Sequence, residues 1–139
     1  YRQIKEAEKD QIYRHILWRE NRKESIKEYK LTTVTYGITS APFLAVRALF
    51  YIADNCPNEY IQNIIKEDFY MDDLLTGSDT ITECKTIQQE VSSQLATYGF
   101  NLRKWLSNEK EIIQNVETAI ENAVIQFEDG ESVKTLGLQ

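Results

Sequence analysis

The sequence predicts an α+β fold in which helices pack on one face of a mainly antiparallel sheet. Three observations support this class: segments rich in β-branched and aromatic residues occur near both ends of the chain, apolar residues recur at helical spacing between them, and a hairpin pattern interrupts the helical part. The 139 residues, 42% of them hydrophobic, suffice to bury the core of one domain.

Two strands are expected near the N-terminus. Residues 13–19 and 29–36 are rich in β-branched and aromatic residues, and the charged residues 21–27 between them are typical of a solvated turn. The two segments should therefore be neighbouring strands. His15 has no Cys, Asp or Ser constellation around it, so we interpret it as a surface or half-buried histidine.

Two helices should follow. The segment Ser40-Ala41-Pro42 is typical of a helix start, because Ser caps free N–H groups and Pro is tolerated in the first turn. Apolar residues occupy every face of this helix, which predicts burial against the sheet. A second, shorter helix should start at Pro57 and carry apolar residues at positions 60, 61, 64 and 65.

A β-hairpin is expected in the middle of the chain. Residues 68–70 and 74–76 flank the centre Met71-Asp72-Asp73, and Gly77 ends the pattern. This arrangement would place the two acids at the tip of the hairpin.

The rest of the chain predicts two further helices and two strands. Thr80 and Glu83 form a capping-box pattern ahead of a helix that Gly99 can terminate. A strand over 100–105 and a last strand over 133–138 should enclose the other helix. The first helix has the apolar stripe Cys84, Ile87, Val91 and Leu95, and the second starts at Asn108 and carries Ile112, Ile113, Val116 and Ile120.

The composition argues against several classes of protein. With 16 Lys+Arg and 22 Asp+Glu, the net charge of −6 argues against a protein held to nucleic acid by a global positive field. No apolar run approaches the ~20 residues of a membrane span, so we expect no membrane partner and an intracellular location. Cys56 and Cys84 lack close-spaced Cys or His partners, which excludes a zinc site and argues against a disulfide framework.

Asp72 and Asp73 are the main candidates for chemistry. They lie between apolar strand residues, where like charges repel and desolvation is costly. Mg²⁺ would remove that cost, since it prefers oxygen ligands and completes its shell with waters and substrate phosphates. Such carboxylates on a stiff hairpin suit phosphoryl transfer by two metal ions ~4 Å apart. On the residues alone, an exposed acidic turn held in water is the commoner explanation of such a pair.

The segments around this pair resemble those of reverse transcriptases, in the same order. Residues 69–75 (FYMDDLL) look like motif C. The other similar segments are YRQI at 1–4, the tail of motif A; YGITSAPF at 36–43, motif B; GFNLRKW at 99–105, the place of motif D; and KTLGL at 134–138, motif E or primer grip. The sequences of these segments most resemble those of the BEL/Pao group of LTR retrotransposons, and the resemblance covers nearly the whole chain.

The resemblance implies that residues 1–139 are a partial reverse transcriptase domain containing the end of motif A, part of the fingers, motifs B, C and D, and the start of motif E. It implies a palm-like antiparallel sheet that carries the YMDD hairpin. The activity would be RNA-directed DNA polymerisation with Mg²⁺, or Mn²⁺ in its place. The partners would be a primed RNA or DNA template, dNTPs, and the fingers, thumb and RNase H regions of a polyprotein in the cytoplasm or in virus-like particles.

The resemblance also assigns roles to single residues. Asp72 would be the main metal-binding aspartate and Asp73 a secondary metal ligand or a structural residue. Lys104 would protonate pyrophosphate, with Arg103 as a competitor. The expected nucleotide-binding residues are Tyr1, Tyr36 and Gly37, where Gly permits close backbone approach, and the expected primer-binding residues are Tyr70, Met71, Leu136 and Gly137.

One departure from the family pattern affects the expected activity. In reverse transcriptases another catalytic aspartate stands a few residues before the aromatic residue of motif A, which is Tyr1 here. Asp10 is a poor replacement, because the charged residues 5–9 precede it. We therefore expect an excerpt from a longer polypeptide that has negligible polymerase activity by itself. The alternative is a non-catalytic retrotransposon remnant or a repurposed nucleic-acid-binding or protein-binding module.

Two groups of residues have simpler interpretations. The aromatic residues Trp18, Trp105, Phe43 and Phe50 are expected in the core rather than as platforms for bases. The cations of the first turn either contact a template backbone or lie in a solvated loop: Arg19, Arg22, Lys23 and Lys27.

Overall fold

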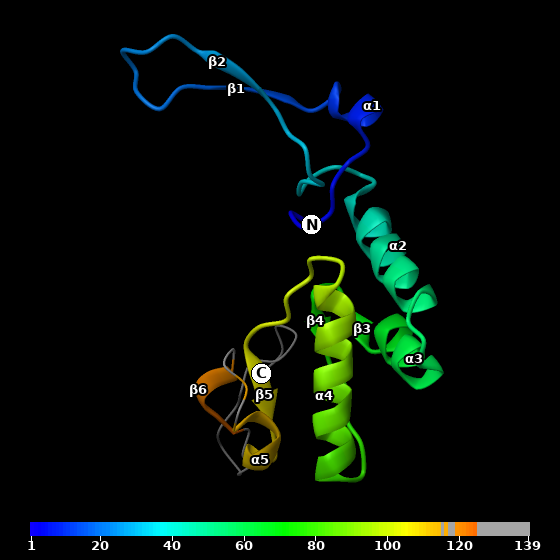
Figure 1. Cartoon of the computed structure of the whole chain (residues 1–139). Helices are drawn as coiled ribbons and strands as arrows, with labels where there is room; N and C mark the ends of the chain where they lie inside the picture. Colours follow the sequence, from blue (N-terminus) through cyan, green and yellow to red (C-terminus); the bar gives the residue numbers. More distant parts are fainter. Residues whose placement is uncertain (115, 117–118, 125–139) are drawn as a thin grey trace. The chain divides into compact units, whose positions relative to one another are not determined.

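The computed structural model describes residues 1–114, 116 and 119–124, and the chain divides into two compact units, Tyr1–Ala48 and Leu49–Gln139 (Figure 1). The predicted α+β class is confirmed, because several helices accompany small two-stranded sheets. None of the helices in the described residues combines the length and the apolar composition needed to cross a bilayer.

The first unit contains a β-hairpin. The short helix α1 (Glu8–Gln11) precedes β1 (His15–Trp18) and β2 (Lys27–Lys30). The two strands pair antiparallel, with His15 opposite Lys30 at one end and Trp18 opposite Lys27 at the other. The predicted pair of neighbouring strands is therefore confirmed, although each strand is shorter than the sequence pattern suggested.

Side-chain and backbone contacts hold the base of this hairpin. The guanidinium of Arg14 lies 2.8 Å from the carboxylate of Glu6 and donates a hydrogen bond to Thr35 Oγ1 at 3.2 Å. An isolated antiparallel bridge joins Lys5 to Thr33. The segments before and after the hairpin are thus held side by side.

The helix α2 (Ala41–Asp54) spans the boundary between the units, and the remaining elements belong to the second unit. In chain order these are α3 (Glu59–Glu67), β3 (Phe69–Tyr70), β4 (Asp73–Leu74), α4 (Ile81–Ala96), β5 (Trp105–Ser107), α5 (Lys110–Ile113) and β6 (Ala119–Val124). The strands β3 and β4 form an antiparallel hairpin, whereas β5 and β6 pair parallel.

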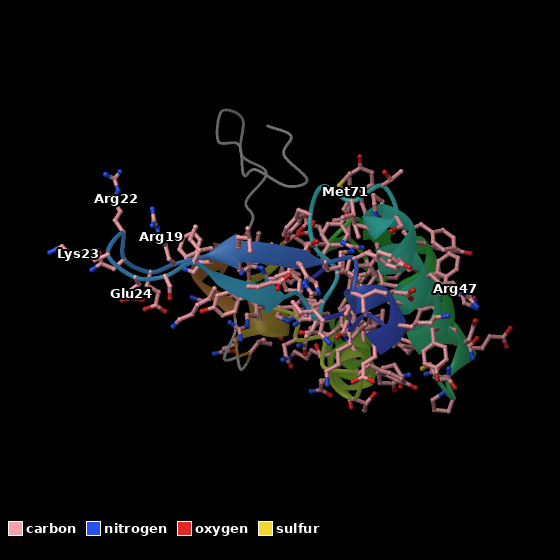
Figure 2. All side chains as sticks on the ribbon, turned by 90° about the horizontal axis from the view of Figure 1, so that it is seen from above. Arg19, Arg22, Lys23, Glu24, Arg47 and Met71 are labelled. Carbon is pink, nitrogen blue, oxygen red and sulfur yellow. The ribbon has the colours of Figure 1, made fainter. Side chains whose placement is uncertain are left out.

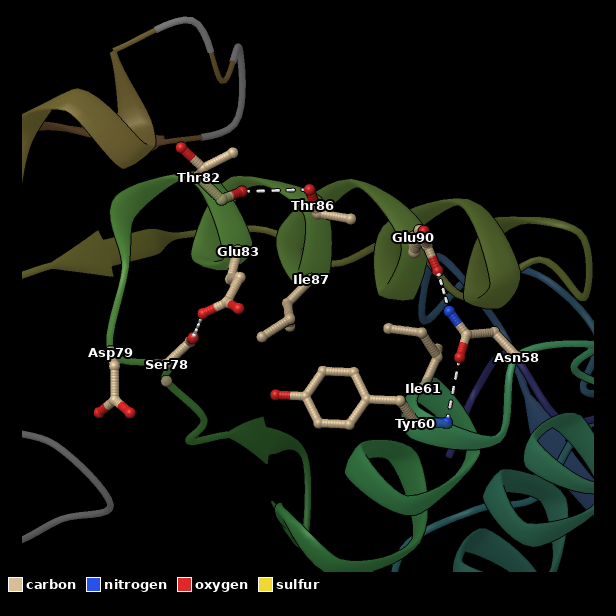
Figure 3. A pocket seen from close by; sticks show the side chains of 11 residues that line it. Asn58, Tyr60, Ile61, Ser78, Asp79, Thr82, Glu83, Thr86, Ile87 and Glu90 are labelled. Atoms are coloured by element: carbon tan, nitrogen blue, oxygen red, sulfur yellow. Dashed lines mark hydrogen bonds between the residues drawn. The ribbon is translucent and has the colours of Figure 1, made fainter.

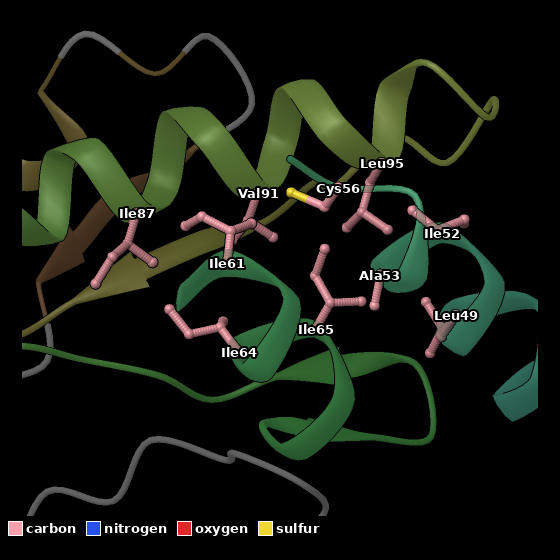
Figure 4. Close-up of a cluster of buried hydrophobic side chains, with 10 residues drawn as sticks. All are labelled: Leu49, Ile52, Ala53, Cys56, Ile61, Ile64, Ile65, Ile87, Val91 and Leu95. Carbon is pink, nitrogen blue, oxygen red and sulfur yellow. The ribbon is translucent and has the colours of Figure 1, made fainter. Parts of the chain in front are cut away.

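The core of the second unit lies between the end of α2 and the helices α3 and α4 (Figure 4). The predicted stripe of α4 is confirmed, because its members Ile87, Val91 and Leu95 are buried one helical turn apart. A hydrogen bond from Gln94 Nε2 to the carbonyl oxygen of Ile52, 2.9 Å long, also ties α4 to α2. The complete cluster is Leu49, Ile52, Ala53, Cys56, Ile61, Ile64, Ile65, Ile87, Val91 and Leu95.

The helix termini follow their local chemistry. Asn58, rather than Pro57, caps α3, since its side-chain oxygen accepts a hydrogen bond from the backbone N–H of Tyr60 at 3.0 Å. Thr80 caps α4 as predicted and accepts from the N–H of Glu83. Gly99 follows the end of α4 with a φ of +81°, a conformation that favours glycine.

The strand arrangement differs from the single sheet that the sequence suggested. Each sheet in the described residues has two strands, and β5 with β6 is parallel. Residues 100–104 form no strand, and β5 starts at Trp105. Short strands such as β3 and β4, of two residues each, pair locally and leave little backbone to extend a sheet.

The prediction of a helix from Asn108 onward is mostly wrong. Only α5 is helical, its N-cap is Glu109, and Ile120 lies in β6. Val116, Ile120 and Val124 are β-branched, and such residues favour strands over helices. The predicted last strand over 133–138 lies outside the described residues.

The expected burial of three aromatic residues is also wrong. Trp18 is 58% exposed, Phe43 is 68% exposed and Phe50 is 37% exposed. In α2 the buried residues Ala41, Leu49, Ile52 and Ala53 share one side, and Phe43 lies on the opposite side. Apolar residues on every face of a helix therefore did not imply burial of every face.

Candidate functional site

The predicted hairpin forms as β3–β4 and presents its acids to solvent, but only Asp72 lies at the tip, and the prediction that Asp73 would also lie there is wrong. Tyr70 pairs with Asp73, so Met71 and Asp72 occupy a two-residue turn, and all four residues are exposed. Asp72 lies at the tip, while Asp73 is the first residue of β4.

The base of this hairpin is fixed to the core of the second unit. The partly buried side chains of Phe69 and Leu74 pack against the core cluster, and the N–H of Leu75 donates to the carbonyl oxygen of Asp68 at 3.0 Å. A packed base with an exposed tip holds the carboxylate of Asp72 on a short, anchored element.

Met71 adopts an uncommon backbone conformation at the tip. Its φ is +57°, in the left-handed region that residues other than glycine rarely occupy. A positive φ at the first central position is typical of type I′ and II′ hairpin turns, and type II′ favours glycine there. Outliers of this kind cluster at functional sites, because the surrounding structure must hold the strain.

The substitution Met71→Gly should raise the free energy of unfolding by about 0.5–1 kcal/mol, since glycine adopts a positive φ without a Cβ clash. Urea denaturation measures this change. Met71→Ala is the matched control, because alanine keeps the Cβ and should give no gain. Equal stability of the two variants would show that strain at position 71 is negligible.

The surroundings of Asp72 and Asp73 differ from those expected from the sequence, and they also indicate whether a metal ion fits there. Both residues are exposed, so the desolvation cost expected from their apolar neighbours does not apply. Among the described residues, no group of three or more His, Cys, Asp or Glu side chains lies close enough to hold a metal ion. Two adjacent carboxylates suit Mg²⁺ in chemistry and supply part of its ligand shell, as is usual for this ion.

Tyr1 and Tyr36, both expected at the nucleotide, are brought together in the first unit. Their rings meet edge to face with centroids 4.8 Å apart and an interplanar angle of 88°. The N–H of Val34 donates to the carbonyl oxygen of Ile4 at 2.9 Å, which holds the two segments in register. Tyr36 is 69% exposed and offers a free aromatic surface.

The backbone of Gly37 adopts a conformation that favours glycine. Its φ is +86°, which is strained for other residues. No heavy atom of the described chain lies within 4 Å of the position that a Cβ would take, and the close approach of a nucleotide or template base to this glycine stays a prediction.

Lys104 extends from a segment that is anchored on the core. Phe100 and Leu102 are partly buried against the core cluster, whereas Arg103 and Lys104 are exposed. Lys104 also has a positive φ, +60°, immediately before β5. The expected primer-grip residues Leu136 and Gly137 lie outside the described residues.

An open groove of about 690 Å³ lies between the start of α3, the loop before α4 and α4 itself (Figure 3). Ile61 and Ile87 point toward each other across it, and the side chains of Ser78 and Glu83 meet at one end. This groove could not be predicted from the sequence, because its lining comes from three separate segments.

The carboxylate of Glu83 accepts two hydrogen bonds at one end of the groove. Ser78 Oγ donates to its carboxylate at 2.5 Å and Thr80 Oγ1 does so at 3.0 Å. The bond from Ser78, followed by that from Thr80, lowers the pKa of Glu83 below its ordinary value of 4.5. The capping box is thus modified, because the Glu83 side chain accepts hydrogen bonds from hydroxyl groups, while the backbone N–H of Glu83 donates to Thr80 Oγ1.

This lowered pKa predicts a pH dependence of stability. The contribution of ionised Glu83 is fully present above pH 4.5, the value expected for the unfolded chain, and is lost as the pH falls through the lower pKa of the folded chain. Glu83→Gln should therefore flatten this acid loss in denaturation curves measured across that range. The double variant S78A/T80A should flatten it equally, since it removes both donors, and identical pH profiles for all three proteins would contradict the assignment.

The predicted site residues thus fall into two groups. Tyr1, Tyr36 and Gly37 belong to the first unit, and the residues of the β3–β4 hairpin, with Lys104, belong to the second. No protein-family model matches the sequence, and neither curated proteins nor solved structures gave a match.

Proposed function

We propose that the chain is the central palm segment of a BEL/Pao-like reverse transcriptase, whose parent polypeptide extends a primer on an RNA or DNA template. The observation that carries the proposal is the β3–β4 hairpin, in which the sequence YMDD forms a two-residue turn with Asp72 at an exposed tip. Five segments resemble reverse transcriptase motifs and occur in the same order along the chain, which supports the proposal.

In this proposal Asp72 and Asp73 hold Mg²⁺, or Mn²⁺ in its place, through carboxylate oxygens. When bound, such ions stabilise the attacking and leaving oxygens of an in-line phosphoryl transfer. The resemblance assigns the remaining aspartate of the metal site to the polypeptide before Tyr1. The resemblance makes Asp72 the principal ligand, and Asp72 occupies the exposed turn.

The other residues orient the substrates. Tyr70 and Met71 lie under the primer terminus, so that the 3′-hydroxyl group faces the α-phosphorus of the dNTP. Tyr1 and Tyr36 form an aromatic boundary of the nucleotide site, which their edge-to-face contact keeps rigid. Lys104 donates a proton to the pyrophosphate leaving group. Leu136 and Gly137 contact the primer backbone.

Primer extension tests the proposal. A longer polypeptide that supplies an aspartate before Tyr1 should incorporate dNTPs on a primed template with Mg²⁺, whereas residues 1–139 alone should show negligible incorporation. Robust synthesis by the 139 residues would contradict the need for the upstream aspartate. A folded longer polypeptide that makes no DNA would contradict the polymerase proposal and favour a non-catalytic remnant or binding module.

A further inference from the structure

The groove beside α4 contains a large exposed aromatic ring, in contrast to the β1–β2 turn, where Figure 2 shows charged side chains extending into open space. Tyr60 lies in the first turn of α3 and is 55% exposed. Figure 3 shows its ring extending along the groove toward the end where Ser78 and Glu83 meet. Ile61 and Ile87 close the floor and are only 1% and 3% exposed, so the ring of Tyr60 is the main apolar surface that a ligand meets there.

The carboxylates of the groove lie toward its two ends. Glu83 and Asp79 are at the end formed with Ser78, and Glu90 is at the other end beside Asn58 (Figure 3). Among the described residues that line the groove, none is Lys, Arg or His, so the lining has a formal charge of −3. Glu83 and Glu90 are seven positions apart on α4, which places them on one face of the helix about 10.5 Å apart along its axis.

Hydrogen bonds hold the carboxylates of Glu83 and Glu90 in place. The hydroxyl groups of Ser78 and Thr80 both donate to Oε2 of Glu83, and the side-chain amide of Asn58 donates to Oε2 of Glu90 at 2.7 Å. Within the described part of the chain, no hydrogen bond or ion pair reaches Oε1 of either residue. Each carboxylate is therefore positioned by neutral groups and keeps one oxygen and its whole negative charge for a ligand.

We propose that this groove binds an arginine-containing segment of a partner protein. One guanidinium group stacks on the ring of Tyr60 and pairs with Glu83, and a second pairs with Glu90. Arginine fits better than lysine, because its guanidinium is planar, stacks on aromatic faces and donates two parallel hydrogen bonds to a carboxylate. A volume of about 690 Å³ is typical of ligand sites and exceeds what one side chain fills.

The separation of Glu83 and Glu90 determines the spacing of the two arginines. In a polyproline II helix, residues i and i+3 point to the same side and lie about 9 Å apart. This distance is close to the separation of the two acids along α4. A segment of the form Arg-x-x-Arg in this conformation therefore presents both guanidinium groups to the groove at once. Its backbone makes no internal hydrogen bonds and stays solvated above the open groove.

The charge of the groove argues against other classes of ligand. A nucleotide, a phosphate ion or a nucleic-acid strand is negatively charged and is repelled by three carboxylates. The N-terminus of α4 would attract an anion, but Thr80 already caps it and Glu83 lies in its first turn. The inference does not rest on the proposed polymerase function, because neither Asp72 nor Asp73 lines this groove.

Nuclear magnetic resonance spectra of the ¹⁵N-labelled full chain, titrated with the peptide acetyl-Arg-Pro-Pro-Arg-amide, test the proposal. Amide signals of residues 58–61 and 78–90 should shift. Replacement of both arginines by citrulline, a neutral side chain of the same shape, should weaken binding about tenfold, since it removes two ion pairs and the stacked cation. The peptide acetyl-Arg-Pro-Arg-Pro-amide, whose guanidinium groups point to different sides, should bind about threefold more weakly.

Variants of the chain separate the ring from the charges. Tyr60→Leu should weaken binding about threefold, whereas Tyr60→Phe, which keeps a ring, should bind like the unaltered chain. Glu90→Gln should also weaken binding about threefold. Glu67→Gln is the matched control, because Glu67 is an exposed acid of α3 outside the groove and its substitution changes the net charge equally. The same spectra report whether each variant is folded.

Several results would overturn the proposal. These are the absence of signal shifts at millimolar peptide, equal binding of the citrulline peptide, and equal affinities of Glu67→Gln and Glu90→Gln. Tighter binding of spermidine or inorganic phosphate than of the peptide would also overturn it, as would self-association of the chain that Glu90→Gln abolishes. Asp72→Asn should bind the peptide like the unaltered chain, which separates failure of this proposal from failure of the polymerase proposal.

Discussion

Asp72→Asn should lower primer extension by the longer polypeptide more than about a hundredfold, because loss even of a residue that supports a metal ligand costs 10–100-fold. The amide keeps the size of the side chain but removes the negative charge that attracts a divalent cation. Asp72 is exposed at the tip of an anchored hairpin, so the substitution should leave stability nearly unchanged. Steady-state incorporation of dNTPs, with denaturation curves for both proteins, measures the two effects separately.

Two further variants make this experiment specific. Asp73→Asn should lose less activity than Asp72→Asn, because Asp73 has the secondary role. Asp79→Asn is the matched control, since Asp79 is an exposed acid in the same unit outside the hairpin. Equal activity of the Asp72 and Asp79 variants would rule out a metal-binding role for the hairpin.

Leu95→Ala should lower the free energy of unfolding of the second unit by about 2–5 kcal/mol. The side chain of Leu95 is 1% exposed and belongs to the cluster that joins the end of α2 to α3 and α4. Its truncation removes buried apolar surface and leaves a cavity that helices packed on both sides cannot fill. A loss of this size approaches the total stability of a small domain.

Urea denaturation followed by circular dichroism measures this loss. Leu75→Ala is the matched control, because Leu75 is 61% exposed and its truncation should change stability by less than about 0.5 kcal/mol. A difference between the two variants below about 1 kcal/mol would show that the α3–α4 cluster is not the main source of stability.

Features set by local chemistry could be predicted from the sequence. Thr80 caps α4 because its hydroxyl oxygen reaches the N–H of Glu83, and Gly99 provides a positive φ just after the C-cap Thr97. The YMDD turn forms because two short apolar strands flank two residues that can reverse the chain. Each of these depends on neighbours within a few positions in the sequence.

Features set by distant neighbours could not be predicted in the same way. The faces of α2 are all apolar, yet Phe43 is exposed, since burial depends on which side other helices cover. The groove beside Glu83 could not be predicted, because it requires knowledge of which segments meet.

The candidate site shows the same division. The position of Asp72 at a hairpin tip follows from local sequence, and the contact of Tyr1 with Tyr36 agrees with their shared nucleotide-binding assignment. The positive φ of Gly37 became known only from the structure.

The two-stranded sheet β1–β2 also affects how the purified chain should behave at high concentration. A sheet of two strands has only edge strands, and the unpaired N–H and C=O groups of an edge can recruit another extended chain. On β2 the three charged residues Lys27, Glu28 and Lys30 oppose such pairing, whereas β1 has the sequence HILW and no Lys, Arg, Asp or Glu. Aggregation of the concentrated protein should therefore begin along β1.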